Sequence, residues 1–210
     1  MPFFVSKFRK IQVFKDCIVE HFYKYKMQYL ILGVIVLSAL IVGLIAGFKK
    51  VNEATLATLP DVTFGRYLQN TITLGQLFVS RLFSFVGILI LIWLLHFNKW
   101  LGLFSVIILI YNAFVVGCTC AILMSLCKFG VFIMLIYIPC HLLTLFCLIA
   151  FTAVCINFSF DTCNSGVGSL SKEFFDSIKF VLIAICLLQL VACILEILLL
   201  PWINSAIIIT

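Results

Sequence analysis

The stretch MQYLILGVIVLSALIVGLIAGF, from Met27 to Phe48, decides the class of this protein. It contains no charged residue, and about 20 apolar residues in an α-helix are enough to cross the ~30 Å hydrocarbon core of a bilayer. The stretch is longer than the core of a signal peptide and ends in Lys49 and Lys50 rather than in small residues typical of a cleavage site. We therefore expect it to remain as a membrane helix.

The rest of the chain has the same apolar character. Of its 210 residues, 65% are hydrophobic and only 10% are charged, and the mean hydropathy is +1.29, which leaves too little polar surface to cover a soluble globule. Four more apolar runs follow the first, at Leu82 to Phe97, Trp100 to Leu126, Val131 to Phe160 and Phe180 to Leu200. The run from Leu82 is short for a span unless Thr73 to Ser80 extends it past Arg81. The runs lack the period-two alternation of membrane β-strands. The sequence predicts an all-α, polytopic membrane helix bundle of about five transmembrane helices, spanning residues 27–210.

The first 26 residues form a basic, amphipathic segment. Apolar residues recur there every three or four positions among six Lys and Arg, at Phe4, Phe8, Ile11, Phe14, Ile18 and Phe22. This pattern predicts an interfacial helix on the cytoplasmic surface. The net charge of +6 is concentrated in this segment and not in a groove lined with aromatic residues, so anionic lipid headgroups, and not nucleic acid, are the expected partners.

Two longer connections are expected, an outer loop at 49–81 and an inner loop at 161–179. Basic residues number about nine on the side of the N-terminus and five on the other side, which predicts a cytoplasmic N-terminus and a C-terminus outside the cell membrane. In the outer loop, Phe64, Tyr67 and Leu68 indicate a partly amphipathic piece lying on the outer face. An external partner would dock there.

Ten cysteines are present, eight of them in or at the ends of apolar runs. Three pairs are seven residues apart and should share a helix face: Cys120 and Cys127, Cys140 and Cys147, Cys186 and Cys193. There is no CxxC pair and no zinc-ligand spacing. The pattern favours small residues at helix contacts, with metal or redox chemistry as the alternative, and it predicts no metal site and no cofactor.

The stretch IYIPCHLLT, from Ile136 to Thr144, places a helix breaker and an ionisable side chain inside an apolar run. Pro139 should kink the helix and free a backbone carbonyl a turn earlier, which Thr144 or a neighbouring helix would help satisfy. His141 and Cys140 are adjacent, so their side chains diverge by about 100° and do not form a nucleophile and base. We expect His141 to face the bundle interior, with a substrate or proton site as the alternative.

Glu196 is the carboxylate of the fifth apolar run. It lies five residues before Pro201, which is about 7.5 Å along a helix from that end, and Trp202 marks the interface there. At this depth the carboxylate should snorkel or pair, while a contact with another helix or a partner, and proton coupling, remain alternatives. The sequence shows no Ser-His-Asp set, paired catalytic carboxylates, phosphate loop or HExxH motif, so no enzyme is expected.

The closing segment LEILLLPWINSAIII, with Glu196 five residues before Pro201, resembles that of the stage II sporulation protein M family. The likeness extends to the basic opening KDCIVEHFYKYKMQYLILGVIVLSALIVGLIAG, to NAFVVG with Gly117, and to IPCHLL on a long fourth span. It covers most of the chain from about Lys15. Related members often carry Pro-His-Gly and a further Glu on this span, whereas here Cys140 and His141 follow the proline and a Thr stands near the position of the Glu.

The family resemblance implies a polytopic scaffold that holds cell-wall hydrolases at the bacterial membrane during engulfment of the forespore. It therefore predicts a non-enzymatic membrane scaffold with peptidoglycan hydrolases as partners on the outer face, and with Glu196, Pro201 and His141 as structural or partner-binding residues. The alternative is the membrane subunit of a transporter, in which His141 and Glu196 would line a path. Assembly into a homo-oligomer is left open.

Overall fold

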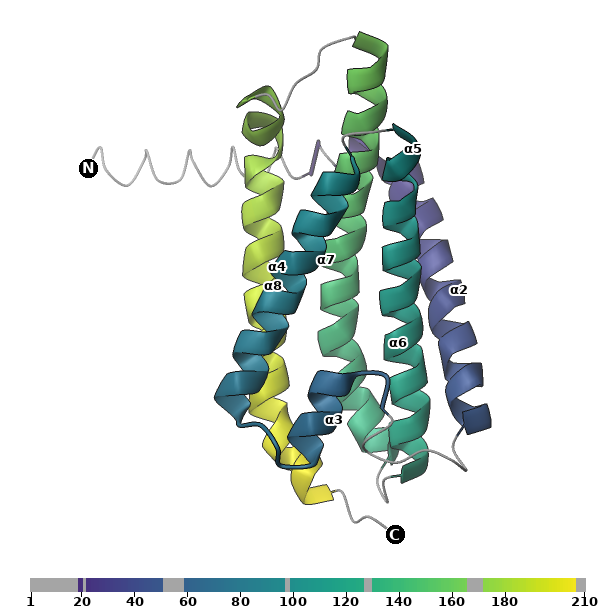
Figure 1. The fold of residues 1–210 in the computed structure, drawn as a ribbon, viewed down its shortest axis with the longest axis vertical. Coiled ribbons are helices and arrows are strands. Elements are labelled where there is room, and N and C mark those ends of the chain that lie inside the picture. The colour runs from purple at the N-terminus through teal and green to yellow at the C-terminus, as the bar shows by residue number, and fades with distance from the viewer. Residues whose placement is uncertain are drawn as a thin grey trace, which may run out of the picture.

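A computed structural model describes residues 19–20, 22–50, 59–96, 99–126, 130–165 and 172–206. Within these ranges the chain is helical and has no strand (Figure 1), which confirms the predicted all-α helix bundle. The predicted interfacial helix at residues 1–26 falls largely outside the described ranges.

Five long helices form the bundle, and each contains a segment of 21 to 24 residues that is long and apolar enough to cross a membrane. They are α2 (Lys26–Lys50), α4 (Leu74–Leu95), α6 (Phe104–Leu126), α7 (Gly130–Ser165) and α8 (Lys172–Ala206). At about 1.5 Å per residue, a helix of even 21 residues is long enough to cross a hydrocarbon core of ~30 Å. The chain is therefore a multi-pass membrane protein, as the five apolar runs predicted.

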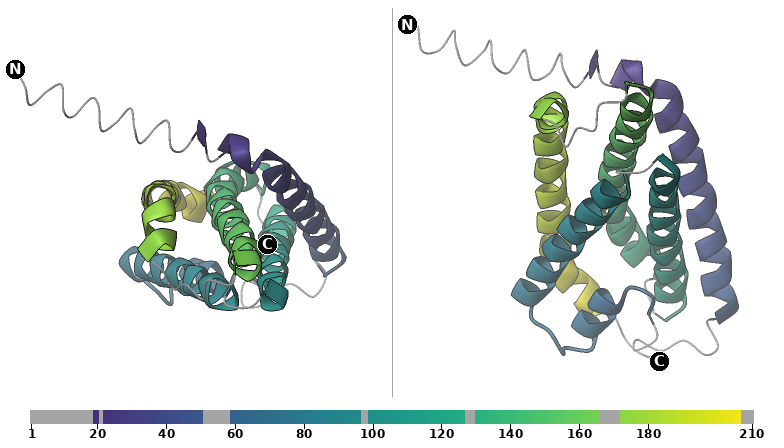
Figure 2. Two further views of the ribbon diagram at one scale, coloured as in Figure 1. Left: turned by 90° about the horizontal axis from the view of Figure 1, so that it is seen from above. Right: turned by 45° about the horizontal axis from the view of Figure 1, so that its top comes forward.

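Two short helices mark the two ends of the bundle. At one end, α3 (Val62–Leu68) lies beside the start of α4, and at the other end α5 (Lys99–Gly102) precedes α6 (Figure 1). Seen along the bundle, α7 lies in the middle, with α2 and α6 on one side and α4 and α8 on the other (Figure 2). We call the two ends the α3 end and the α5 end.

The helix α4 begins earlier than the apolar run Leu82 to Phe97 suggested. Thr73 caps it, because its hydroxyl accepts from the Gln76 N–H (3.3 Å) while its own N–H donates to the Gln76 side chain (2.9 Å). The predicted outer loop 49–81 was therefore too long at its C-terminal end. Arg81, the last residue of the predicted outer loop and one of the five basic residues on that side, lies inside a membrane-spanning helix.

The contact between α2 and α6 is built on glycine. A Cβ added to Gly117 would lie 2.2 Å from the Leu40 carbonyl oxygen, and one added to Gly43 would lie 2.3 Å from the Phe114 carbonyl oxygen. A Cβ added to Gly47 would lie 2.7 Å from the Cys118 carbonyl oxygen of α6. Glycines four residues apart let two membrane helices approach until their backbones touch. In lipid there is no hydrophobic driving force between helices, so this close van der Waals packing is what stabilises their contact.

The helix α3 is folded into the bundle. Figure 1 shows it in the gap where α4 diverges from α6, and its Phe64, Tyr67 and Leu68 are buried. Asn70, with φ of 56°, turns the chain after α3, a left-handed conformation that Asn tolerates. The apolar side chains of this segment pack on the bundle and are not available to a partner, while docking of an external partner on the segment stays a prediction.

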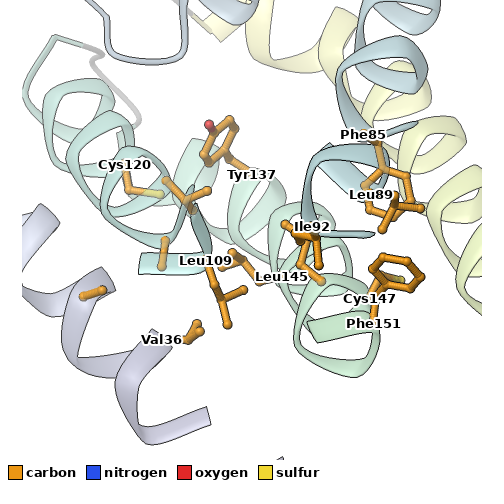
Figure 3. Packing of buried hydrophobic residues seen from close by; sticks show 14 of the residues in the cluster. Val36, Phe85, Leu89, Ile92, Leu109, Cys120, Tyr137, Leu145, Cys147 and Phe151 are labelled. Atoms are coloured by element: carbon orange, nitrogen blue, oxygen red, sulfur yellow. The ribbon is translucent and has the colours of Figure 1, made fainter. Parts of the chain in front are cut away.

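The core runs through all the long helices. Val36, Leu109, Leu145 and Ile92 come from α2, α6, α7 and α4 and meet in one cluster (Figure 3). Cysteines contribute to it as small apolar residues, since six of the seven whose side chains are described are buried. Cys186 is exposed while Cys193 is buried, so the seven-residue spacing does not give this pair a shared environment.

Candidate functional site: a buried charge cluster at the α3 end

An arginine on α4 joins two carboxylates from opposite ends of the sequence. The guanidinium of Arg81 donates to both oxygens of Asp61, from Nη1 at 3.1 Å and from Nη2 at 2.6 Å. It also donates to Oε1 of Glu196, from Nε at 3.2 Å and from Nη2 at 2.9 Å. All three side chains are mostly buried. The arginine thus links the segment before α3, the helix α4 and the helix α8.

Asp61 is the most highly connected member of this cluster. It caps α3 by accepting from the Phe64 N–H at 3.1 Å, and it accepts from the Tyr137 hydroxyl of α7 at 2.8 Å. Its own backbone N–H donates to the Thr119 hydroxyl of α6 at 3.2 Å. The carboxylate of Asp61 therefore ties the start of α3 to α4 and α7, and its backbone N–H ties it to α6.

Burial and pairing have opposite effects on Asp61. Burial raises the pKa of its carboxyl, but the charge of Arg81, the more distant His141 and the hydrogen bonds from Arg81 and Phe64 outweigh burial and lower the pKa to about 2. The group is therefore ionised at neutral pH. A carboxylate at this place is stable only because its charge is compensated.

His141 and Glu196, both singled out in the sequence, lie next to each other. His141 Nε2 is 3.8 Å from Glu196 Oε1, and the imidazole packs on the ring of Tyr137 with centroids 3.9 Å apart. Both residues are buried. Glu196 pairs with Arg81 and does not snorkel, and His141 faces the bundle interior as expected. Pro201 continues α8, and its side chain lies outside what the structure describes.

The stretch around Pro139 divides between two faces of α7. The helix continues through the proline, which is exposed and lines an apolar groove against α2. His141 and Cys140 instead line a polar cavity on another side. Thr144 donates to the Cys140 carbonyl at 3.4 Å. It therefore does not satisfy the carbonyl that Pro139 frees one turn before itself, as had been one expectation.

A cavity of about 220 Å³ adjoins the charge cluster. Its polar wall comes from four helices and the segment before α3, and includes Asp61, Arg81, Asn112, His141, Gln189 and Glu196. Asn112, His141, Gln189 and Glu196, which all lie within apolar runs, therefore converge on one space. Asn157 of α7 lies elsewhere and is hydrogen-bonded to Gln28 of α2 and to the Ala153 carbonyl.

A smaller polar group lies at the α5 end. His96 follows the last residue of α4, and its Nδ1 is hydrogen-bonded to the Ile92 carbonyl. Burial lowers the pKa of this imidazole. His96 Nε2 and the hydroxyl of Ser159 are buried without a hydrogen-bond partner among the described residues, and both lie beside Gly102.

The cluster is suited to holding helices and to binding a polar group. Cys140 and His141 share a wall of the cavity, but no hydrogen bond joins their side chains in the described part of the chain. The described residues contain no group of three His, Cys, Asp or Glu side chains arranged to hold a metal ion. The cluster provides ion pairs, hydrogen bonds and one titratable imidazole.

Three members of the cluster were not identified from the sequence as site residues. Arg81 and Asp61 fall within the predicted outer loop 49–81, and Tyr137 falls within the apolar run Val131 to Phe160. The signal was nevertheless present, because a charged residue within helical reach of an apolar run calls for a partner of opposite charge at the same depth. Pairing Arg81 with Glu196 follows once α4 is extended back to Thr73.

Comparisons with known proteins give no relative for this chain. No family model matches it, and neither the curated proteins nor the solved structures contain a match. The likeness to the stage II sporulation protein M family therefore rests on the quoted sequence patterns.

Proposed function

We propose that this protein is a non-enzymatic scaffold of the cell membrane, with its α3 end outside and its α5 end in the cytoplasm. The observation that supports the proposal is the link made by Arg81, which ties α3 to α4 and α8 through Asp61 and Glu196. A scaffold must present its outer surface in a fixed position, and buried ion pairs can specify one arrangement of the elements that they join.

The orientation gains support from the position of Arg81. Charges in the loops, not those inside a span, set the orientation of a membrane protein. With Arg81 placed within α4, the outer side loses one of its five counted basic residues, so the count becomes about nine against four. This favours a cytoplasmic N-terminus more strongly than the first count did.

A labelling experiment tests the orientation. In a variant with Cys163 as the sole cysteine, a thiol reagent that cannot cross membranes should leave intact cells unlabelled. In a matched variant with Gln69→Cys as the sole cysteine, placed on the exposed turn after α3, the reagent should label the protein. The reverse pattern in sealed cells would overturn the proposed orientation.

The partner side of the proposal comes from the resemblance. It implies peptidoglycan hydrolases bound on the outer face, whereas anionic lipid headgroups at the basic segment 1–26 are expected from its charge. Because the apolar side chains of α3 are buried, a partner would contact its outward side, where Val62 and Arg66 are exposed. Neither contact requires the protein to be an enzyme.

Site-specific photo-crosslinking tests the partner. A crosslinking residue at Arg66 should capture a wall hydrolase in cells, whereas the same residue at Lys179, which is exposed toward the α5 end, should not. Capture of hydrolases at neither position, with both variants present in the membrane at normal abundance, would contradict the scaffold role.

A second candidate function is the membrane subunit of a transporter. The specific observation in its favour is the convergence of polar side chains on the 220 Å³ cavity, which is where a transported molecule would be held. An ATPase captured from the Lys179 position, in place of a hydrolase from the Arg66 position, would favour this candidate.

A further inference from the structure

The polar atoms around the cavity are unequally used. Most of the hydrogen-bond donors are already occupied within the protein: Arg81 uses four of its five N–H groups on Asp61 and Glu196. The hydroxyls of Tyr137 and Thr144 donate to Asp61 and to the Cys140 carbonyl. The side-chain amide of Asn112 donates to the Ile108 carbonyl at 2.8 Å.

The acceptors on the same wall are left over. The side-chain oxygen of Gln189 has no hydrogen-bond partner among the described residues, although the residue is only 4% exposed. His141 Nε2 is likewise buried and without a hydrogen-bond partner there, and it is an acceptor in the neutral tautomer that carries its proton on Nδ1. The contacts of Glu196 with Arg81 and His141 all use a single carboxylate oxygen, Oε1. Asn112 uses its amide nitrogen on Ile108, and its amide oxygen is not part of that bond.

The charges around the cavity do not balance. Two carboxylates, Asp61 and Glu196, face the single guanidinium of Arg81, which leaves one excess negative charge when His141 is neutral. An uncompensated charge away from water is costly. The site is therefore complete when a positive group that donates hydrogen bonds enters it.

We propose that the cavity binds a primary ammonium group, with Gln189, Glu196 and His141 as the acceptors of its three N–H bonds. A primary ammonium carries one positive charge and three donors, as the lysine side chain does, and so matches both the excess charge and the unused acceptors. A carboxylate or phosphate ligand would face hydrogen-bond acceptors instead of donors, and it would add its own negative charge to the excess one.

The size and the rim of the cavity suit a small amine. Its volume of about 220 Å³ is larger than the roughly 150 Å³ of an engineered protein cavity that accommodates benzene. Ser84 of α4 and Tyr111 of α6 line it and are exposed. Because both lie within membrane spans, the ammonium can belong either to a water-soluble amine or to the headgroup of an aminophospholipid.

This inference is independent of the scaffold role, and it would supply the substrate site of the second candidate function. A direct binding measurement separates the questions, because capture of a wall hydrolase at Arg66 does not depend on amine binding. Failure of amine binding would not contradict the scaffold role, and failure of hydrolase capture would not contradict amine binding.

Binding is tested with ethylammonium as the probe on the full chain purified in detergent. Calorimetric titration should detect binding of ethylammonium but not of tetramethylammonium, which has the same charge and no N–H, nor of ethanol. The variant Gln189→Met removes the unused acceptor and leaves every ion pair intact, so it should weaken binding at least about tenfold. Ser38→Ala, which alters only a hydroxyl bonded within α2, should not change the affinity.

The source of the ammonium is then resolved by repeating the titration in lipid discs. Competition by phosphatidylethanolamine, absent in discs of phosphatidylcholine, assigns the site to a lipid headgroup, and equal affinity in both assigns it to a soluble amine. The proposal is overturned if ethylammonium does not bind the intact protein, if tetramethylammonium binds as tightly, or if the Gln189→Met variant, folded and monodisperse, keeps the full affinity.

Discussion

Two regions of this bundle are held together in opposite ways. Between α2 and α6 the backbones touch at Gly43 and Gly117, with no room for even a methyl group. Between α3, α4, α7 and α8 the contacts are made by long side chains around Arg81, next to a cavity of about 220 Å³. The first contact depends on shape and the second on charge.

The difference follows from the lipid solvent. Lipid tails are as apolar as the side chains, so apolar helices associate through close packing, which small residues permit. Buried charges gain nothing from such packing and persist only where a partner of opposite sign is within reach. We expect the α2–α6 contact to be sensitive to added volume, and the charge cluster to be sensitive to the loss of a single charge.

The largest effect is expected from Arg81→Leu. It leaves the buried carboxylates of Asp61 and Glu196 facing each other without compensation, which costs about 3 to 5 kcal/mol. Thermal unfolding in detergent should show a large loss of stability. The matched change Arg66→Leu, on the outward side of α3, should leave the unfolding temperature nearly unchanged, and equal loss in both variants would contradict the role given to Arg81.

The next largest effect is expected from Gly117→Ala. Its Cβ would lie 2.2 Å from the Leu40 carbonyl oxygen, so α2 and α6 must separate, at a cost of about 1 to 3 kcal/mol. Gly33→Ala is the control, since nothing lies within 4 Å of a Cβ there, and helix propensity predicts a gain of up to ~1 kcal/mol. If both variants unfold at the same temperature, the close α2–α6 contact is not needed for stability.

A smaller, graded effect is expected at Glu196. Glu196→Gln keeps an acceptor for Arg81, which remains paired with Asp61, whereas Glu196→Leu leaves part of the guanidinium unsatisfied at about 1 to 3 kcal/mol. Unfolding temperature and partner capture should therefore fall more for Leu than for Gln. Complete loss of cellular function in both variants, with partner capture preserved, would instead indicate proton transfer at this residue.

The smallest effect at accessible pH concerns Asp61. Because its pKa of about 2 is below the usual value of 3.8, its contribution to stability is fully present above pH 3.8 and is lost as the pH falls toward 2. Between pH 7 and 5 we expect no change from this group. Hydrogen exchange of 62–68 should accelerate only in the acidic window, and in Asp61→Asn it should already be fast at pH 7. The intact protein losing α3 protection at pH 6 would contradict the assignment.

Much of the architecture could be predicted from the sequence because long apolar runs in lipid have few structural options. Every backbone polar group must be satisfied internally, so such a run becomes a helix. The start of α4 could not be read from hydropathy, since the capping pair Thr73 and Gln76 and the charged Arg81 interrupt the apolar pattern. The helix forms through them because its polar groups find partners in the folded bundle.

The candidate site was predictable only in part. His141 and Glu196 stand out because ionisable residues inside apolar runs are expensive, and the structure brings them together. Asp61 lies in a segment with no membrane signal of its own, and its role depends on α3 folding back beside α4. Such a return is a tertiary contact over 20 residues to Arg81 and 76 residues to Tyr137, which no local pattern encodes.

The central claim is that the charge cluster is required, in addition to the apolar packing of Phe64, Tyr67 and Leu68, to hold α3 on the bundle. The most direct test is hydrogen exchange by mass spectrometry on the intact protein and on Arg81→Leu, comparing 62–68 with 40–47 of α2 at a temperature where both proteins remain folded. The account predicts that Arg81→Leu exchanges at least about tenfold faster across α3 while the α2 segment is unchanged. Unchanged exchange in α3, or equal acceleration in both segments, would contradict it.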